Sequence, residues 1–148
     1  MRAVIQLVSE ASVEVGGKEL CSIGTGLLVL LGVSREDRLG DSLWLARKIA
    51  NMRIFKDSEN KTNLSTADVE GDMLVVSQFT LLADMKKGNR PSLGAAAPNE
   101  AAIPLYRAFI SELKRAFHGK VLSGEFGASM RVSLVNDGPF TVIIDSKD

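Results

Sequence analysis

The chain has 148 residues, 45% of them hydrophobic, and its 18 basic residues balance 18 acidic ones. This length and composition predict a single domain, residues 1–148, with a substantial buried core, and argue against a second domain. The balanced charge excludes a global attraction to nucleic acid, so any contact with RNA must come from a local basic patch.

The N-terminal part of the chain is typical of a β-hairpin followed by a buried strand. Over residues 3–15 apolar residues alternate imperfectly with polar ones, and Gly16-Gly17 then supplies a tight reversal into residues 18–23. Residues 27–33 are continuously apolar, which indicates a strand covered on both faces. Such a strand requires at least three layers or a tight interface.

The middle of the chain predicts a helix and then a strand. Asp41 or Ser42 can cap a helix that runs through Met52. A polar, turn-rich stretch follows. Residues 73–77 are an apolar run that predicts a strand, and a further strand is expected to continue through Leu82.

An irregular segment and a second helix come next. Residues 84–98 form the longest stretch without a helix or strand pattern, and loops of this length in small domains are often functional. This segment carries a cluster of basic side chains: Lys86, Lys87 and Arg90. A helix capped by Asn99 is expected to follow, with apolar residues at helical spacing as far as Phe117.

The chain ends in three predicted strands, residues 120–123, 128–135 and 140–145. Strands therefore dominate, and two helices lie at separate points of the chain. This order of elements predicts an α/β domain in which helices pack on a layered sheet.

Conventional hydrolytic groups are scarce. The one histidine, His118, follows the second predicted helix, where it is most simply a helix-end residue. One histidine and one cysteine, Cys21, at distant positions match no zinc spacing, and no carboxylate cluster replaces them. We therefore predict no Ser-His-Asp or Cys-His arrangement, no metal ion and no other cofactor.

The expected compartment is the cytoplasm. Cys21 alone cannot form an internal disulfide, which suits a reducing compartment. No secretion signal opens the sequence, and no apolar run is long enough to cross a bilayer.

Two short polar segments stand where a strand pattern ends or breaks. They are Ser77-Gln78-Phe79-Thr80-Leu81 and Asn136-Asp137-Gly138-Pro139-Phe140-Thr141. A sheet can hold atoms rigidly against a ligand at such positions, which predicts an enzyme or a selective binder. Taken alone, the first segment also fits a strand with polar residues on its solvent face, and the second fits a plain β-turn.

Together and in this order, the two segments closely resemble the signature motifs of the D-aminoacyl-tRNA deacylases, which hydrolyse D-amino acids from mischarged tRNA. The resemblance extends over nearly the whole chain, through residues 1–6, 26–33, 53–55, 90–92 and 126–128, and through Met130. It implies a three-layer α/β/β fold, a homodimer with active sites at the subunit interface, and D-aminoacyl-tRNA as the substrate.

The resemblance also implies roles for the first segment. The backbone amide of Phe79 and the amide or hydroxyl of Thr80 would face the ester carbonyl, while Ser77 and Gln78 would hold the strand end in place. The 2′-hydroxyl of the terminal adenosine would assist the attack. The alternative makes Thr80 the nucleophile, although the sequence places no base beside it.

For the second segment, the resemblance implies a Gly-cisPro motif formed by Gly138 and Pro139. Inserted into the partner's pocket, its carbonyls would hold the substrate's ammonium group and exclude L-aminoacyl groups. Asn136 and Thr141 would brace the motif. Many family members carry an arginine that helps to lock this motif where the present chain has Leu7, so either another group fixes the motif or chiral rejection is altered.

Two further sets of residues have both a functional and a structural interpretation. Phe126 and Met130 match the family's pocket for the terminal adenosine, but each also fits a core position. Lys86, Lys87 and Arg90 are candidates for contact with tRNA phosphates, or are simply part of a solvated loop.

Two other functions remain open at this level. A noncatalytic module that binds tRNA ends or free D-amino acids is consistent with the same motifs. A structural dimerisation domain would show neither binding nor turnover.

Overall fold

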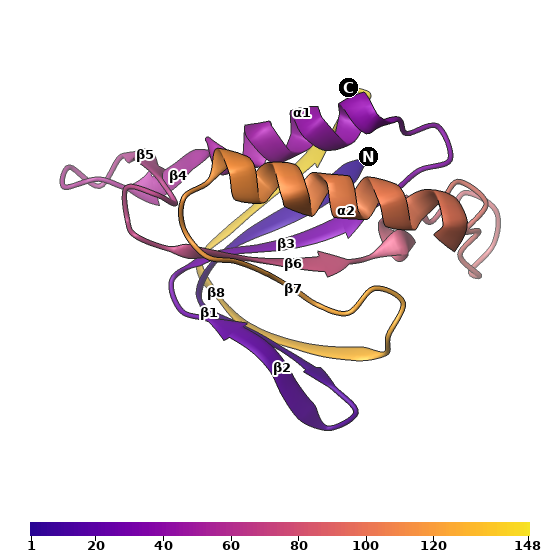
Figure 1. The fold of residues 1–148 in the computed structure, drawn as a ribbon, viewed down its shortest axis with the longest axis horizontal. Coiled ribbons are helices and arrows are strands. Elements are labelled where there is room, and N and C mark those ends of the chain that lie inside the picture. The colour runs from indigo at the N-terminus through magenta and orange to yellow at the C-terminus, as the bar shows by residue number, and fades with distance from the viewer.

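Two helices lie side by side on one face of a six-stranded sheet in the computed structural model, which describes all 148 residues (Figure 1). The helices are α1 (Leu39–Ala50) and α2 (Asn99–Ala116). The strands are β1 (Arg2–Val15), β2 (Lys18–Ile23), β3 (Gly26–Gly32), β4 (Arg53–Lys56), β5 (Thr62–Ser65), β6 (Asp72–Ser77), β7 (Val121–Ser123) and β8 (Met130–Asp145). Neither helix combines the length and the apolar character needed to cross a membrane.

The sheet has the order β2-β1-β3-β6-β7, with β8 also paired to β1, while β4 and β5 form a separate ribbon. β1 connects the two parts of the sheet because its two halves pair with different strands. Its first half pairs with β3 and with the end of β8, and its second half pairs with β2 and with the start of β8. The predicted hairpin is confirmed, with positive φ angles at Gly16 and Gly17 in its turn.

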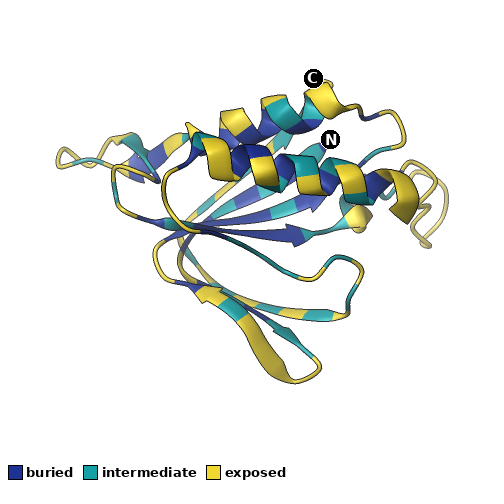
Figure 2. Cartoon of the chain, in the orientation of Figure 1, coloured by how far each residue is buried: buried dark blue, intermediate teal, exposed yellow.

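The second half of β1 and the first half of β8 turn with β2 beneath β3, β6 and β7, so that helices, central strands and this lower sheet form three layers (Figure 1). Two apolar clusters separate the layers. The helix-side cluster includes Leu27, Val29 and Leu31 of β3. The opposite cluster includes Leu28 of β3, which confirms that this strand is covered on both faces (Figure 2).

One acidic side chain joins the two helices. Glu112 on α2 is 7% exposed and accepts hydrogen bonds from Arg47 on α1 and from Arg115 on its own helix. These bonds from Arg115 and Arg47 lower the pKa of Glu112 to about 2. The pair between Arg47 and Glu112 therefore links α1 to α2.

The start of α1 differs from the prediction. The helix begins at Leu39, with Arg38 as its N-cap, and ends at Ala50 instead of Met52. Asp41 lies inside the first turn, where its carboxylate accepts a hydrogen bond from the Arg38 amide at 2.7 Å. Ser42 is buried and its hydroxyl has no hydrogen-bond partner, so neither predicted cap residue is the cap.

The chain does not continue as a strand after Ser77. The Gln78 amide donates a hydrogen bond to the Leu31 carbonyl at 2.8 Å, and the pairing of β6 with β3 ends there. Phe79–Leu82 then form a single 3-10 turn. The expected strand through Leu82 is wrong because no neighbouring strand offers partners beyond Leu31.

Two boundaries in the second half also differ. Asn99 is the first residue of α2, and Pro98 is the N-cap, so Asn99 is not the predicted cap. The two strands expected around residues 136–139 are one continuous strand, β8. β8 pairs with β1 before and after this region, and the register shifts on both sides of Val8. These shifts allow the turn-like residues to remain within the strand.

Candidate functional site

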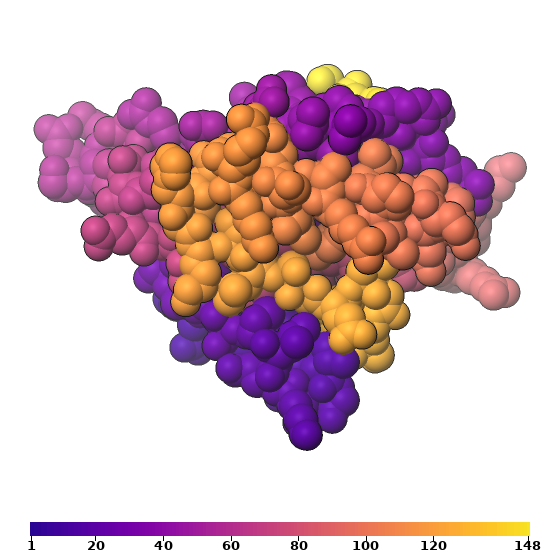
Figure 3. All heavy atoms as spheres, in the orientation of Figure 1, coloured from indigo at the N-terminus to yellow at the C-terminus, as the bar shows by residue number.

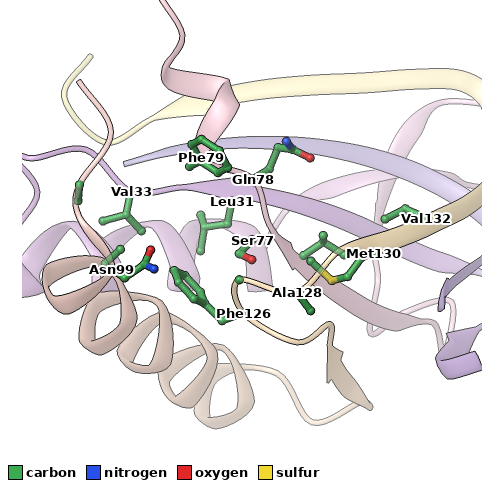
Figure 4. Close-up of a pocket in the computed structure, with 14 residues that line it drawn as sticks. Leu31, Val33, Ser77, Gln78, Phe79, Asn99, Phe126, Ala128, Met130 and Val132 are labelled. Atoms are coloured by element: carbon green, nitrogen blue, oxygen red, sulfur yellow. The ribbon is translucent and has the colours of Figure 1, made fainter. Parts of the chain in front are cut away.

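A cavity of about 480 Å³ opens where β3 and β6 end, beside the start of α2 and the segment between β7 and β8 (Figure 4). Its volume is typical of a small-molecule site. It is lined by Leu31, Val33, Val76, Ser77, Gln78, Phe79, Ala97, Asn99, Ala102, Phe126, Gly127, Ala128, Met130 and Val132.

The first signature segment forms one wall of this cavity. Ser77 is the last residue of β6 and pairs with Leu31 of β3, which fixes the point where the chain leaves the sheet. The Gln78 side chain turns to donate a hydrogen bond to the Thr80 hydroxyl. Ser77, Gln78 and Phe79 line the cavity, whereas Thr80 does not.

Two main-chain amides have no partner, one in this wall and one directly after it. The amides of Phe79 and Thr80 donate no hydrogen bond within the protein, because the pairing with β3 ends at Gln78 and the 3-10 turn begins its own bonds later. Free amides at the rim of an apolar cavity are suited to bind an oxygen that develops negative charge.

The opposite wall contains Phe126 and Met130. The Phe126 ring packs edge-on against Tyr106 of α2, with 5.3 Å between ring centroids and 61° between ring planes. Phe126 also contacts the helix-side core and Met130 contacts the opposite core. Each residue therefore contributes to the core with one side and to the cavity with the other, so the two interpretations of these residues are compatible.

No ionisable side chain lines the cavity. Its polar side chains are the Ser77 hydroxyl and the amides of Gln78 and Asn99. His118 lies exposed beyond the far end of α2, and no group of three or more His, Cys, Asp or Glu side chains is arranged so that it could hold a metal ion. The arrangement can orient a ligand by hydrogen bonds, but it holds no side chain that would serve as a general base.

The second signature segment lies outside this cavity. Asp137, Gly138 and Pro139 are exposed on β8, and no residue from 136 to 141 lines the cavity. The Gly138-Pro139 bond is cis. Gly138 has a φ of 144°, and a Cβ atom at this position would lie 2.8 Å from the Phe140 nitrogen, so a larger residue is strained here.

Asn136 holds this exposed segment in shape. Its side chain accepts a hydrogen bond from the Phe140 amide at 3.0 Å and donates one to the Thr141 hydroxyl at 3.0 Å. Leu7, which stands where many family members have arginine, is buried in the helix-side core and offers no donor. The side-chain bonds that brace the segment therefore come from Asn136 and not from position 7.

The basic cluster lies on a separate loop. Lys86, Lys87 and Arg90 are exposed, and none of them lines the cavity. Reciprocal main-chain bonds between Asp84 and Ser92, each 2.9 Å long, close the base of the loop.

Several residues that line the cavity were not predicted as site residues from the sequence. Asn99 was expected only as a helix cap, and Leu31 and Val33 only as parts of a buried strand. Their signal is weak because apolar strand ends and helix-start asparagines occur in most domains, and only the packing of α2 against β3 brings them to one cavity.

Comparisons with known proteins agree with this geometry. The family described as D-Tyr-tRNA(Tyr) deacylase matches residues 4–145. A D-aminoacyl-tRNA deacylase from Christiangramia forsetii is 55% identical, with 100% of this chain and 99% of the relative covered. One from Chlorobaculum parvum is 52% identical, with 99% and 98% covered. A solved structure of a c-Myc DNA unwinding element binding protein is 41% identical, with a TM-score of 0.92 over 98% of each chain. The chain belongs to the D-Tyr-tRNA(Tyr) deacylase family.

Proposed function

We propose that this D-aminoacyl-tRNA deacylase hydrolyses its substrate ester in the cavity between Ser77 and Met130. The observation that supports this assignment is a ligand-sized cavity that contains the first signature segment and no ionisable side chain. An aminoacyl ester is an activated substrate, so hydrolysis can proceed through positioning and oxyanion stabilisation without a protein base.

In the proposed reaction, the oxygen of a water molecule bonds to the ester carbonyl carbon. The amides of Phe79 and Thr80 donate to the developing oxyanion, since no other group of the chain uses them. The bond from the carbonyl carbon to the ribose 3′-oxygen then breaks, and the proton released by the water ends on that oxygen. The neighbouring 2′-hydroxyl of the substrate carries this proton.

Ser77 and Gln78 act as positioning residues in this scheme. Ser77 is the last residue of β6. Gln78 donates two hydrogen bonds, one from its main-chain N–H to the Leu31 carbonyl and one from its side chain to the Thr80 hydroxyl. A nucleophilic role for Thr80 is less well supported, because its hydroxyl already accepts the Gln78 bond and no base lies beside it. We assign Thr80 to orientation.

The adenosine at the 3′ end of the tRNA is placed against Phe126 and Met130. An aromatic ring and a thioether give a flat, polarisable surface for a base. The exposed loop with Lys86, Lys87 and Arg90 is assigned to phosphates of the acceptor stem, because its cations lie outside the cavity and face solvent.

Chiral selection is assigned to Gly138 and Pro139 of a second copy of the chain. The segment is exposed and contributes no residue to the cavity lining of its own subunit, so we assign it to the cavity of a second subunit. Val135 and Ile143, 48% and 68% exposed, flank the segment on β8 and offer apolar surface for such a contact. A homodimer with two interface sites follows.

A paired deacylation assay tests the activity assigned to the cavity. Release of tyrosine from D-tyrosyl-tRNA and not from L-tyrosyl-tRNA is expected. Binding of the tRNA without turnover would favour the noncatalytic module, and neither binding nor turnover would favour a structural domain.

A subunit-mixing experiment tests the shared site. Phe79→Pro removes an amide donor from the cavity but leaves Gly138 intact, and Gly138→Ala does the reverse. The Gly138→Ala protein is mixed with an excess of the Phe79→Pro protein, so that most Gly138→Ala subunits pair with a Phe79→Pro subunit. In such a dimer one site combines the unaltered cavity of the Gly138→Ala subunit with the unaltered Gly138 of its partner. This site is expected to reject L-tyrosyl-tRNA again. If Gly138 acts in the cavity of its own subunit, mixing does not restore rejection of L-tyrosyl-tRNA.

A further inference from the structure

A second groove adjoins the cavity and has a different chemical character. It lies between α2 and the segment after β7, has a volume of about 600 Å³, and shares the Phe126 side chain with the cavity. Its lining comprises Ile103, Tyr106, Arg107, Ile110, Ser111, Lys114, Ser123, Gly124, Glu125 and Phe126. In the space-filling view, α2 and the segment after β7 are neighbours on the face toward the viewer (Figure 3).

The helix side of this groove is cationic. Arg107, Ser111 and Lys114 follow one another at the spacing of one helix face, and the two cations are about 10 Å apart along the axis from a rise of 1.5 Å per residue. Both cations are exposed, and neither forms an ion pair or a hydrogen bond within the protein. Their neighbours Glu112 and Arg115 are paired with each other.

One acid is also present. Glu125 lies on the opposite side of the groove, exposed and without an ion pair. The groove thus combines two unpaired cations and two serine hydroxyls, Ser111 and Ser123, with a single carboxylate. This set fits a chain of anionic groups that also carries hydrogen-bond acceptors, as a nucleic-acid backbone does.

We infer that this groove binds the unpaired nucleotides that precede the terminal adenosine of the tRNA, with their phosphates on Arg107 and Lys114. The inference rests on the proposed function of the cavity. With the terminal base against Phe126, the strand on its 5′ side can pass directly into the groove, because Phe126 lines both spaces. The chain's balanced charge makes such a local cationic strip necessary for holding a single strand.

The test compares three D-tyrosyl esters: of adenosine alone, of a CCA trinucleotide, and of whole tRNA. The double variant Arg107→Gln/Lys114→Gln is expected to raise KM for the trinucleotide and tRNA esters about tenfold, with kcat within twofold of the unaltered protein. Hydrolysis of the adenosine ester, which does not reach the groove, is expected to stay the same.

Salt dependence supplies an independent readout. Each phosphate contact with a single strand contributes about 0.7 to the slope of log affinity against log salt, so loss of two contacts reduces the slope by about 1.4. Glu125→Gln is expected to act in the opposite direction and to lower KM for the trinucleotide ester two- to threefold.

The matched control is Lys48→Gln/Lys56→Gln, which removes the same charge from exposed positions outside the groove. An unchanged KM and salt slope for the trinucleotide ester in the groove variant, or an equal change in the control, overturns the inference. If the unaltered protein hydrolyses none of the three esters, the proposed function itself fails, and that outcome is separate from failure of the groove.

Discussion

The segments 77–80 and 136–141 carry similar small polar residues, yet the fold places them in opposite environments. The first ends a strand that is buried on both faces and lines an apolar cavity. The second lies exposed within the long strand β8, between the pairs that Asn136 and Thr141 form with β1, and the side chain of Asn136 braces it. This contrast suggests a division of labour in which the cavity stabilises the transition state and the exposed segment discriminates between enantiomers.

The largest expected effect is on the cavity side. Phe79→Pro removes the Phe79 amide donor while keeping a φ angle compatible with the first position of a 3-10 turn. Loss of one oxyanion donor typically costs about 10²–10³ in kcat. We therefore expect kcat for D-tyrosyl-tRNA to fall by this factor in single-turnover assays.

Phe79→Ala is the matched control, since it removes the half-exposed ring but retains the amide. Its kcat is expected to stay within a few-fold of the unaltered protein. Equal losses in the two variants would show that the ring and not the amide matters, and the proposed oxyanion contact would be wrong.

The next effect concerns the exposed segment. Gly138→Ala places a Cβ atom 2.8 Å from the Phe140 nitrogen, at a φ angle that disfavours alanine, so the segment must shift. A displacement of about 1 Å in a positioning group can cost about 10²-fold. We expect the ratio of kcat/KM values for D- and L-tyrosyl-tRNA to fall by about this factor.

Gly16→Ala provides the control for this glycine substitution. Gly16 also has a positive φ, but open space surrounds the added methyl group. Its enantiomer ratio should not change. If the Gly138→Ala protein rejects L-tyrosyl-tRNA as well as the unaltered protein does, this segment is not responsible for chiral selection.

A smaller effect is expected at Asn136. Asn136→Ala loses the hydrogen bonds to Phe140 and Thr141, each worth about 1 kcal/mol, or about fivefold. Loss of both bonds should lower the enantiomer ratio by up to about 25-fold. Asn136→Asp keeps the acceptor for the Phe140 amide, so its ratio should fall less; an aspartate variant as damaged as the alanine variant would contradict this account.

The smallest effect on activity is expected at Glu112, which lies away from both segments. Its pKa in the folded protein is about 2, below its ordinary value of 4.5, so its contribution to stability is present above about pH 4.5 and is lost as the pH falls toward 2. Glu112→Gln should lower Tm by a few degrees at pH 7 and leave the enantiomer ratio unchanged.

The difference in Tm between Glu112→Gln and the unaltered protein should shrink between pH 4.5 and pH 2. Glu100→Gln, an exposed position on the same helix without an ion pair, serves as the control. A Tm difference that is independent of pH would mean that the carboxylate pairs with Arg47 and Arg115 do not stabilise the fold.

Local sequence patterns were sufficient for the element types. Alternation over residues 3–15 predicted β1, the glycine pair predicted its turn, and the continuous apolar run predicted a strand buried on both faces. These features depend on the intrinsic geometry of strands and turns, in which the side chains a few residues apart decide which face is buried. Both helices were also found, with errors at their ends.

Apart from the helix ends, the errors occur where a distant partner decides the outcome. The turn-like residues 136–139 remain in β8 because β1 pairs with them on either side of Val8, and the polar residues after Ser77 leave the sheet because β3 offers no partner beyond Leu31. No local pattern contains this information.

The motif residues and the scarcity of ionisable catalysts were visible in the sequence itself, because they depend only on which residues are present. The tertiary structure alone decided that Ser77 and Phe126 share a cavity, that Asn99 joins them, and that Gly138 does not. The physical reason is that a cavity is formed by surfaces of separate elements, and the packing of α2 and the pairing of β8 with β1 determine which surfaces meet.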